Sequence, residues 1–396
     1  MANVSSSNGL EKRPKLRFPG FDEPYRKCRI GDIYAERSQR GAGDMELLSV
    51  TMNDGVMPRS EIEGKDNSSE DKSNYKVVCK GDMVYNSMRM WQGANGVSNY
   101  DGIVSPAYTV LMPIEEIDNQ YFAALFKTSN LINEFRKNSQ GLTSDTWNLK
   151  YPQIRPIRLY IPSLQEQNKI SSFIGTLEER IGKQRQLVDA LKKYKRGLLN
   201  QIFSAISKSS QTRKLRDLVH VSGGKTPSMS NSLYWNGDIV WISSKDMKSN
   251  RISDSELKIT NLALNEMTLY QPGTLLLVAR SGILKHSLPL SILEVDATIN
   301  QDIKALQVFG CNSFFLYYAI LSQEDNIIRT HVKTGTTVQS LMMDSFLDIE
   351  IPIPNMEQQE IIIGEMNLLE NYLDVHVSEL SLLTQARNGL LQQLFI

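Results

Sequence analysis

The chain has 396 residues with 44 Lys and Arg against 44 Asp and Glu, and this balance gives no overall basicity that would indicate a nucleic-acid partner. Its length suggests two or three domains, and no run of about 18 apolar residues predicts a membrane span. The Ser-, Asn- and Lys-rich start does not resemble a signal peptide. Three widely separated cysteines, Cys28, Cys79 and Cys311, predict a reducing, cytoplasmic location.

The first part of the chain predicts a tail followed by a mixed domain. Residues 1–24 are polar and interrupted by Pro and Gly, which favours an extended tail. Residues 25–163 contain an apolar helical pattern at Tyr121–Lys137. Short strand candidates, separated by turn residues, lie at Lys76–Cys79, Met83–Tyr85 and Thr109–Met112. We therefore expect a first domain of mixed α/β content.

A long helix is predicted next, over residues 164–207. From Glu166 to Phe203 the apolar residues recur at alternating spacings of three and four, as in a coiled-coil seam. The candidate helix-pairing residues of this stretch are Ile174, Leu177, Ile181, Gln184 and Leu191. Gln184 and Lys195 are the two polar interruptions of the seam.

The order of domain and helix then occurs a second time. Residues 208–355 contain strand candidates at Ile239–Ile242, Thr274–Val278 and Ala305–Val308 and a helix candidate at Phe314–Leu321. Residues 356–396 again have the seam pattern of a long helix. Its candidate helix-pairing residues are Met366, Leu369, Leu373, His376 and Leu383.

A shift of 192 residues superposes the two halves without a gap. Ile161-Pro162, before the first helix, falls on Ile353-Pro354, and Gly197-Leu198-Leu199 falls on Gly389-Leu390-Leu391. The same shift places the polar seam residues Gln184 and Lys195 on His376 and Arg387. A repeat of this length predicts a tandem duplication, and we interpret the matched polar positions as devices that fix the register of helix pairing.

Charge favours pairing of the two helices with each other. Glu166–Phe203 carries eight Lys and Arg against four Asp and Glu, whereas residues 357–396 carry one Arg against six acidic residues. The expected fold class is therefore α+β: two mixed α/β domains separated by two long helices, which form an antiparallel coiled coil in a pseudo-twofold tandem repeat. The alternative is that each amphipathic helix packs only on its own domain.

No residue pattern predicts catalysis or a bound cofactor in this chain. Gly224-Lys225-Thr226 resembles the end of a P-loop, but the position of the earlier glycine is occupied by Val219. Asp238 with Glu256 and Lys258 fits a metal-dependent nuclease only loosely and has no counterpart in the first domain. The four histidines lack the spacing of metal ligands. We therefore expect a chain that is not an enzyme and has no metal site.

Two groups of loop residues suit the reading of DNA bases. Arg pairs bidentately with guanine edges and Asn or Gln with adenine edges, while glycines allow close approach of the backbone. The loop Asn86–Gly96 combines these residue types. The second domain places Arg280-Ser281-Gly282 at the comparable position, after its Gly273 strand, and adds Ser243-Ser244-Lys245 and Lys225-Thr226. The candidate DNA-binding residues are Arg89, Trp91, Gln92 and Asn95 in the first domain and Lys225, Thr226, Ser244, Lys245, Arg280 and Lys285 in the second.

Together these motifs resemble the specificity subunit of type I restriction–modification enzymes over nearly the whole chain. The resemblance rests on the paired Ile-Pro-x-x-x-x-Gln signatures, Ile161 to Gln167 and Ile353 to Gln359, and on Gly-Leu-Leu-x-Gln near the end of each helix. Inside the domains it rests on Gly224-Lys225-Thr226-Pro227 and on Gly81-Asp82-Met83-Val84.

The resemblance implies a division of labour among subunits. Each mixed domain would be a target recognition domain that reads one half of a bipartite, asymmetric site in double-stranded DNA. The paired helices would set the spacing and dock two methyltransferase subunits, and restriction and translocase subunits would join that core. S-adenosylmethionine, ATP and Mg²⁺ would then bind to the partners rather than to this chain.

Two other functions are compatible with the sequence. One is the recognition subunit of a type II restriction–modification system, and co-purification with a separate methyltransferase would distinguish it. The other is a coiled-coil scaffold that links two protein-binding modules. DNA binding through phosphates weakens steeply as salt rises, so salt dependence separates a DNA-binding protein from a scaffold.

Overall fold

We describe the fold from a computed structural model, of which residues 2–3, 13–41, 44–52, 55–64, 66, 68–333, 335 and 338–396 are described. The chain divides into two compact units. Unit 1 comprises residues 1–185 and 378–396, and unit 2 comprises residues 186–377. Each unit is considered by itself below.

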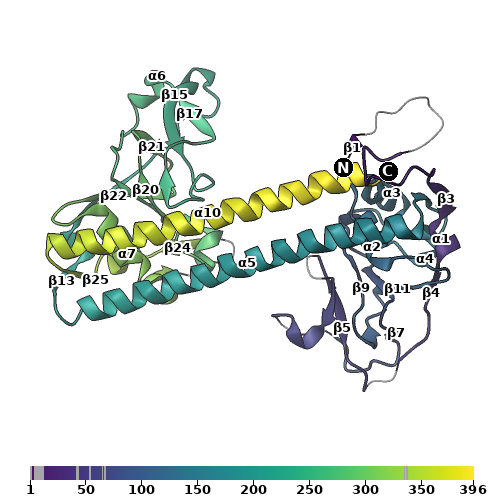
Figure 1. Ribbon diagram of the computed structural model, residues 1–396. Helices are drawn as coiled ribbons and strands as arrows, with labels where there is room; N and C mark the ends of the chain where they lie inside the picture. The colour runs from purple at the N-terminus through teal and green to yellow at the C-terminus, as the bar shows by residue number, and fades with distance from the viewer. Residues whose placement is uncertain are drawn as a thin grey trace. The chain divides into compact units, whose positions relative to one another are not determined.

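Unit 1 consists of short strands and helices followed by the first part of a long helix (Figure 1). Its elements are β1 (Ala2–Asn3), β2 (Leu16–Arg17), β3 (Arg26–Arg29), α1 (Ile30–Ile33), β4 (Tyr34–Glu36), β5 (Leu48–Thr51), β6 (Gly55–Pro58), the 3-10 helix η1 (Arg59–Glu61), β7 (Lys76–Val78), β8 (Met83–Asn86), η2 (Met90–Gln92), β9 (Asn95–Val97), β10 (Gly102–Val104), β11 (Tyr108–Pro113), α2 (Asn119–Leu125), α3 (Ser129–Asn138), α4 (Tyr151–Ile154) and β12 (Arg158–Ile161). The long helix α5 (Leu164–Ile206) begins in this unit, and α10 (Met356–Leu394) ends in it.

The central sheet of unit 1 has four antiparallel strands in the order β4-β11-β8-β9. Side chains of a strand alternate between its two faces. In β8, Met83 and Tyr85 therefore join the core that contains Phe122 of α2, while Val84 packs with Val50 of β5 on the other face. Both faces of this sheet are buried. The remaining strands form the pairs β5-β6, β7-β10, β3-β12 and β1-β2.

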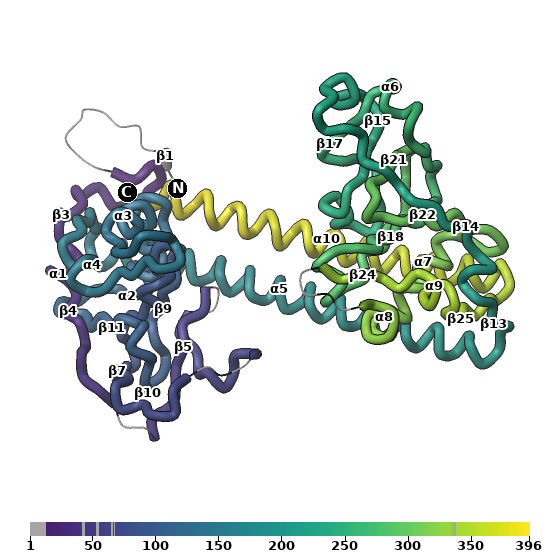
Figure 2. The backbone as a smooth tube through the Cα atoms, turned by 180° about the vertical axis from the view of Figure 1, so that it is seen from behind, coloured from purple at the N-terminus to yellow at the C-terminus, as the bar shows by residue number. Residues whose placement is uncertain are grey.

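Unit 2 repeats this arrangement and adds strands. Its elements are β13 (Gln211–Lys214), η3 (Leu215–Asp217), β14 (Val219–Gly223), η4 (Ser232–Tyr234), β15 (Trp235–Ile242), β16 (Arg251–Ile252), β17 (Leu257–Ile259), α6 (Asn261–Leu264), β18 (Leu275–Val278), β19 (Arg280–Ser281), η5 (Gly282–Lys285), β20 (Leu290–Leu293), β21 (Ala297–Ile299), β22 (Ile303–Val308), α7 (Ser313–Leu321), α8 (Glu324–His331), β23 (Val332–Lys333), β24 (Gln339–Leu341), α9 (Met343–Phe346) and β25 (Glu350–Ile353). Figure 2 shows these elements from behind.

The main sheet of unit 2 has five strands in the order β14-β22-β18-β20-β16. In β18, Leu275 and Leu277 join the core that contains Phe315 of α7, while Leu276 and Val278 join a second core on the other face. Two three-stranded sheets, β17-β15-β21 and β19-β24-β23, and the pair β13-β25 complete the unit.

Equivalent elements of the two units share both position and local geometry. The strand order β4-β11-β8-β9 corresponds to β14-β22-β18-β20, and β3-β12 corresponds to β13-β25. The glycines before β8 and β18 lie 192 residues apart, and both adopt left-handed φ, 93° at Gly81 and 86° at Gly273. Residues with a Cβ rarely adopt this conformation. The predicted tandem repeat of two mixed domains is confirmed.

The two long helices run antiparallel to each other within each unit (Figure 1 and Figure 2). In unit 1, Ile170 near the start of α5 shares a core with Leu394 near the end of α10. In unit 2, Phe203 near the end of α5 shares a core with Ile362 near the start of α10. The helices also pack on the domains, as shown by the ring of Phe395, which lies 5.1 Å from that of Tyr121. The predicted antiparallel pairing is therefore confirmed, and it does not exclude packing on the domains.

The glutamine of each Ile-Pro-x-x-x-x-Gln signature joins a long helix to its domain. Gln167 Oε1 accepts a hydrogen bond from the backbone N–H of Asp118 at 3.1 Å, and its Nε2 donates to Pro162 O at 3.0 Å. Gln359 makes the matching bonds to Asn312 N and Pro354 O, both at 2.9 Å. Asp118 and Asn312 are the N-cap residues of α2 and α7. The signature thus fixes the angle at which each long helix leaves its domain.

A buried ion pair distinguishes the start of α5 from the start of α10. Arg17 donates to both carboxylate oxygens of Glu166, from Nε at 2.9 Å and from Nη2 at 2.8 Å, and Glu166 is 1% exposed. These hydrogen bonds raise the pKa of Arg17. The equivalent residue in the second repeat is Gln358, which is exposed.

The sequence predicts an extended tail for residues 1–24. Of these, residues 1 and 4–12 lie outside the described ranges. Arg17 is bonded within unit 1.

None of the helices in the described ranges is both long and apolar enough to cross a membrane. Cys28, Cys79 and Cys311 are free thiols. Burial raises the pKa of Cys28 and of Cys311 to about 11. These two thiols are therefore protonated, and poor nucleophiles, near neutral pH.

Candidate functional site

The seam of α5 and α10 is the first of the predicted sites. Its apolar residues are buried or half-buried, as expected for the face of a helix that packs against a partner helix. Ile174, Ile181 and Met366 are buried, and Leu177, Leu191, Leu369, Leu373 and Leu383 are half-buried.

The polar seam residues Lys195 and Arg387, which are equivalent in the repeat, each form an ion pair between the two long helices. Lys195 Nζ lies 2.5 Å from Glu370 Oε1 in unit 2, and Arg387 Nη1 lies 2.7 Å from Glu178 Oε1 in unit 1. Lys195 and Arg387 are 192 residues apart, and so are Glu178 and Glu370. Lys195 is equivalent to Arg387 in the repeat, and its partner Glu370 is equivalent to Glu178, the partner of Arg387. The same ion pair therefore occurs once in each unit. This reciprocity is the property of a twofold-related contact, and it gives both units the same helix register.

The second polar interruption consists of Gln184 and His376. Gln184 is 9% exposed. His376 is half-buried, and its ring lies 4.5 Å from that of Tyr372 in an edge-on arrangement. Gln184 and His376 lie near the middle of their helices, and the midpoints of an antiparallel pair meet, so we predict that these two side chains lie close together.

In unit 1, three of the predicted DNA-binding residues, Arg89, Trp91 and Gln92, follow β8 in a turn that we call the reading loop (Asn86–Ala94). Arg89 and Gln92 are exposed, and Trp91 is half-buried. The backbone N–H of Ser87 donates to Ala107 O at 3.0 Å, which ties the loop to the residues that precede β11.

The prediction for Asn95 needs correction. Its side chain is 0% exposed, and its Nδ2 donates to Gly93 O at 3.1 Å. The residue lies inside β9, paired with Tyr85. A side chain that is fully buried and bonded to its own turn cannot reach a base edge, so Asn95 supports the loop instead of reading DNA.

A second loop, which the sequence did not indicate, lies beside the reading loop. We call Gln140–Asn148 the finger loop. Its Trp147 packs edge-on against Trp91 with ring centroids 5.2 Å apart, and Leu149 N donates to Ser87 O at 2.9 Å. The guanidinium of Arg136 lies over the Trp91 ring at 5.6 Å. Only the fold brings these segments together, because about 50 residues of sequence separate them.

In unit 2, Lys225 and Thr226 follow β14 and are exposed. Lys225 N donates to Ile299 O at 3.0 Å, and its carbonyl accepts a hydrogen bond from Trp241 Nε1 at 3.1 Å. The Thr226 hydroxyl donates to Gln301 Oε1. Trp241 is buried, as expected for a core tryptophan, and it holds the backbone that presents Lys225.

Ser244 and Lys245 lie in a tight turn after β15. Lys245 is exposed and Ser244 is half-buried. Asp246 accepts hydrogen bonds from Ser243 N at 2.8 Å and from Glu256 N at 3.0 Å. Burial alone would raise the pKa of Asp246, but these hydrogen bonds outweigh it and lower the pKa. The Asp246 carboxylate is thus engaged in the turn that carries the exposed Lys245.

Arg280 and Lys285 follow β18 at the place equivalent to the reading loop. Both are exposed. Arg280 belongs to β19, where it pairs with Ser340 of β24, and Lys285 ends η5. η5 begins at Gly282, 192 residues after the start of η2 at Met90. The two long helices α5 and α10 are related by the same shift of 192 residues.

Loops of unit 2 that carry predicted residues contact one segment, residues 300–302, which joins β21 to the main-sheet strand β22. Ile242 is the last residue of β15, and Asn300 directly follows β21. The backbone N–H of Asn300 donates a hydrogen bond to Ile242 O at 2.9 Å, which joins the ends of these two strands. The end of β18 is joined to the start of β22 by Ala279 N, which donates to Asp302 O at 2.8 Å. Since Thr226 also bonds to Gln301, the loops carrying Lys225, Lys245 and Arg280 surround the segment 300–302. The exposed cations Lys225, Lys245 and Arg280 are thus carried by loops that meet at this segment.

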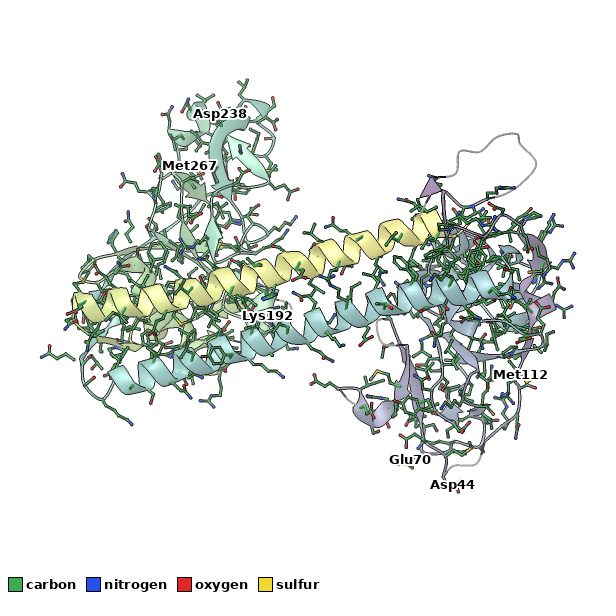
Figure 3. The ribbon with its side chains drawn as sticks, viewed as in Figure 1. Asp44, Glu70, Met112, Lys192, Asp238 and Met267 are labelled. Atoms are coloured by element: carbon green, nitrogen blue, oxygen red, sulfur yellow. The ribbon has the colours of Figure 1, made fainter. Side chains whose placement is uncertain are left out.

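The described part of the chain contains no cluster of metal-ligand side chains. No group of three or more His, Cys, Asp or Glu side chains among its residues could hold a metal ion. Asp238, labelled in Figure 3, is exposed in β15, and Lys258 pairs with Asp254 at 3.0 Å.

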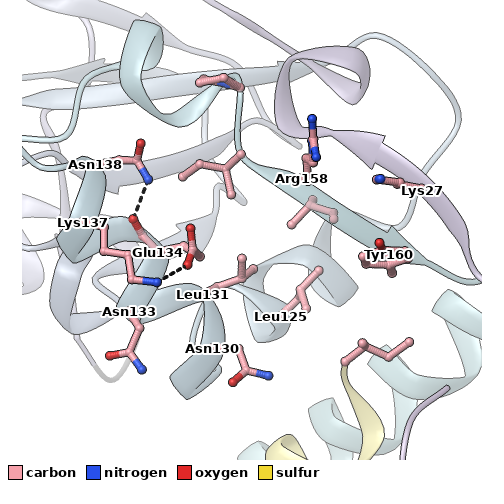
Figure 4. A pocket seen from close by; sticks show the side chains of 14 residues that line it. Lys27, Leu125, Asn130, Leu131, Asn133, Glu134, Lys137, Asn138, Arg158 and Tyr160 are labelled. Atoms are coloured by element: carbon pink, nitrogen blue, oxygen red, sulfur yellow. Dashed lines mark hydrogen bonds and ion pairs between the residues drawn. The ribbon is translucent and has the colours of Figure 1, made fainter. Parts of the chain in front are cut away.

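A hollow of about 840 Å³ in unit 1 lies between α3 and β12 (Figure 4). Its lining includes Lys27, Lys137, Arg158 and Glu134, and Glu134 pairs with Lys137 at 2.7 Å. No His, Cys or Ser lines it. The hollow therefore contains no Ser-His or Cys-His pair for nucleophilic catalysis.

Comparison with known proteins places the chain in one family. A family model described as type I restriction modification DNA specificity domain matches residues 27–193 and again residues 207–378. The chain is 36% identical over 145 residues to a specificity subunit of a type I restriction enzyme from Escherichia coli, and 30% identical over 175 residues to one from Methanocaldococcus jannaschii. These alignments cover 36% and 43% of this chain and only 36% and 40% of the two relatives.

Two solved structures share the fold over almost the whole chain. The S subunit of a type I restriction–modification system from M. genitalium has a TM-score of 0.61 at 15% identity, with 97% of this chain and 99% of that chain covered. A structure reported for the complex assembly and conformational transition of a type I restriction–modification system has a TM-score of 0.55 at 15% identity, with coverage of 96% and 99%.

Proposed function

The chain belongs to the type I restriction modification DNA specificity family, and we propose on this premise that it selects the DNA sequence for a type I restriction–modification complex. The duplicated loop site carries the proposal. In each unit, a loop with an exposed arginine, Arg89 or Arg280, follows the equivalent strand, β8 or β18. Two such sites on domains of different sequence suit a target made of two different half-sites.

Each unit would read one half of a bipartite, asymmetric site in double-stranded DNA. In unit 1, Arg89 and Gln92 are exposed and have the side chains that read guanine and adenine edges. In unit 2, Arg280 would read bases, and Lys225, Lys245 and Lys285 would contact phosphates, which position a protein on DNA. Thr226 and Ser244 supply hydroxyl groups beside them.

The helix pair would set the distance between the half-sites and dock the partner subunits. Reciprocal ion pairs give the pair a defined register and a pseudo-twofold character. A surface that occurs twice in equivalent form suits two copies of one partner, here two methyltransferase subunits. Restriction and translocase subunits would join this core, and S-adenosylmethionine, ATP and Mg²⁺ would bind in those partners.

Salt titration with selected DNA tests the proposal. Duplexes bound by the chain, together with its methyltransferase partner, would be selected from a random pool. Their affinity would then be measured between about 50 and 200 mM salt. A DNA-binding protein that contacts six to ten phosphates loses roughly 10³- to 10⁵-fold in affinity over this range.

Other results would support another function. A chain that enriches no sequence, and whose partner binding ignores salt, would be a coiled-coil scaffold. Specific DNA cleavage by a single partner polypeptide without ATP would indicate a type II system.

A further inference from the structure

We propose that Leu142, at the tip of the finger loop, is an apolar wedge that enters the base-pair stack of the half-site read by unit 1. The inference rests on the proposed function, because it needs unit 1 to bind DNA. It adds a contact of a different kind from the base-edge and phosphate contacts assigned above.

The exposure of Leu142 is the first observation. Its side chain is 102% exposed, which is the highest value among the large apolar residues of the described part of the chain. A single exposed apolar side chain is common on protein surfaces, so exposure alone does not define a site. The neighbours of Leu142 in the loop, Gly141 and Thr143 to Thr146, are exposed as well. The loop therefore projects from the unit with an apolar residue among polar ones.

The finger loop is held in shape by its own hydrogen bonds. Gln140 and Asn148 exchange two backbone bonds, Gln140 N to Asn148 O at 3.0 Å and Asn148 N to Gln140 O at 2.8 Å. Above this bridge, Thr146 N donates to Thr143 O at 3.0 Å, and the Thr146 hydroxyl donates to the same carbonyl at 3.0 Å. A preformed loop loses little conformational entropy on binding.

Gly141 allows the closed shape of the loop. Its φ is 140°, and a Cβ at this position would lie 2.6 Å from Thr146 O. A side chain here would therefore open the loop that carries Leu142.

The surroundings of the loop favour DNA over a protein as its partner. The finger loop contacts the reading loop through Trp147 and Trp91. Within Gln140–Lys150 the exposed Lys150 is balanced by Asp145, and the exposed Arg136, whose guanidinium lies over the Trp91 ring, adds a further cation beside the loop. A cationic base with an apolar tip matches the way architectural proteins insert apolar side chains between base pairs while cations neutralise phosphates.

A wedge of this kind would unstack one base step and bend the duplex. The cost of unstacking depends on the step, and pyrimidine–purine steps deform most easily. Leu142 would therefore contribute to sequence preference at a step that no side chain contacts through hydrogen bonds.

Fluorescence of 2-aminopurine tests the wedge. A duplex carrying the selected site would be prepared with 2-aminopurine at successive positions of the half-site read by unit 1. With the unaltered chain in its complex, we expect increased fluorescence at one step. Leu142→Ala should abolish that increase and weaken binding about 10- to 100-fold, as expected when a buried leucine side chain is lost, while Leu142→Phe should retain both.

Ile114→Ala is the matched control. Ile114 is an aliphatic residue that is 53% exposed and follows β11 at the end opposite Tyr108, so its removal should change neither fluorescence nor affinity.

Four outcomes would overturn the wedge. An unaltered chain that binds its site with no fluorescence change at any step would exclude insertion, although the proposed function would stand. Unchanged binding and fluorescence in Leu142→Ala would do the same. Loss of methyltransferase binding in Leu142→Ala, with DNA binding intact, would show that the loop contacts a protein. A chain that selects no sequence would remove the proposed function and the wedge with it.

Discussion

Among single residues, Arg17 and Glu166 form the pair whose disruption should destabilise unit 1 most. Both side chains are buried and joined by two hydrogen bonds. Glu166→Gln leaves the Arg17 charge buried without its counter-ion, and we expect it to lower the free energy of unfolding by about 3–5 kcal/mol. Urea denaturation followed by circular dichroism measures this effect.

The second repeat supplies the control for this substitution. Gln358 occupies the equivalent position and is exposed, so Gln358→Glu should change the unfolding free energy by less than about 0.5 kcal/mol. Equal effects of the two substitutions would show that the pair with Arg17 contributes nothing specific.

Arg89 provides the residue-level test of DNA reading. Arg89→Ala should relax the base preference at one position of one half-site and leave the other half-site unchanged, at a cost of about 1–3 kcal/mol. Arg29, exposed on β3, is the control cation. Sequence selection with each variant measures the preference. A uniform loss over all sequences would instead identify Arg89 as a phosphate contact.

Asn95 behaves differently from Arg89 although the two are close in sequence. The sequence placed both in one loop, but the pairing of β9 with β8 buries Asn95 completely. Burial depends on which strand lies alongside, and a single loop sequence does not contain that information.

At the scale of elements, the seam of the long helices could be predicted in detail, because its period depends only on local spacing. The ion pairs of the seam could not be predicted, because the partners are far apart in the chain. They are Lys195 with Glu370 and Arg387 with Glu178. The finger loop was missed for the same reason. Its position depends on the contact of Trp147 with Trp91, which local periodicity does not encode.

The ion pairs of the seam should differ in strength according to burial. The side chains of Lys195 and Glu370 are 13% and 6% exposed, whereas those of Arg180 and Glu379 are 65% and 37% exposed. Lys195→Ala leaves a buried carboxylate and should destabilise the protein by about 3 kcal/mol. Arg180→Ala removes only an exposed pair and should cost less than about 1 kcal/mol. Thermal unfolding of both variants compares them, and equal costs would contradict the inferred role of the buried pair.

For the whole molecule, the repeat allowed the order of domains and helices to be predicted, whereas the strand content of the two domains differed. Unit 2 has the additional sheet β17-β15-β21 where unit 1 has the pairs β5-β6 and β7-β10. These segments have no common sequence pattern, so comparison of the two halves gave no guide to them.

The repeat predicts that residues 1–207 alone fold and form a twofold dimer. In such a dimer Lys195 of one copy can pair with Glu178 of the other, because Glu178 is the repeat equivalent of Glu370. Two basic helices then replace a basic and an acidic one, so we expect weaker association that improves with salt. Twofold symmetry requires a palindromic target with two inverted copies of the first half-site.

Sedimentation followed by sequence selection tests both parts of this prediction. A fragment that stays monomeric, or that selects a site without inverted symmetry, would contradict it.

If this chain is the specificity subunit, it reads two different half-sites at a fixed separation. Mapping of methylated adenines across the host genome, with and without this chain, is the decisive measurement. We expect methylation at one bipartite, asymmetric motif with a constant gap, and we expect it to disappear when the chain is removed. A continuous motif, a variable gap, or methylation that persists without the chain would contradict that expectation.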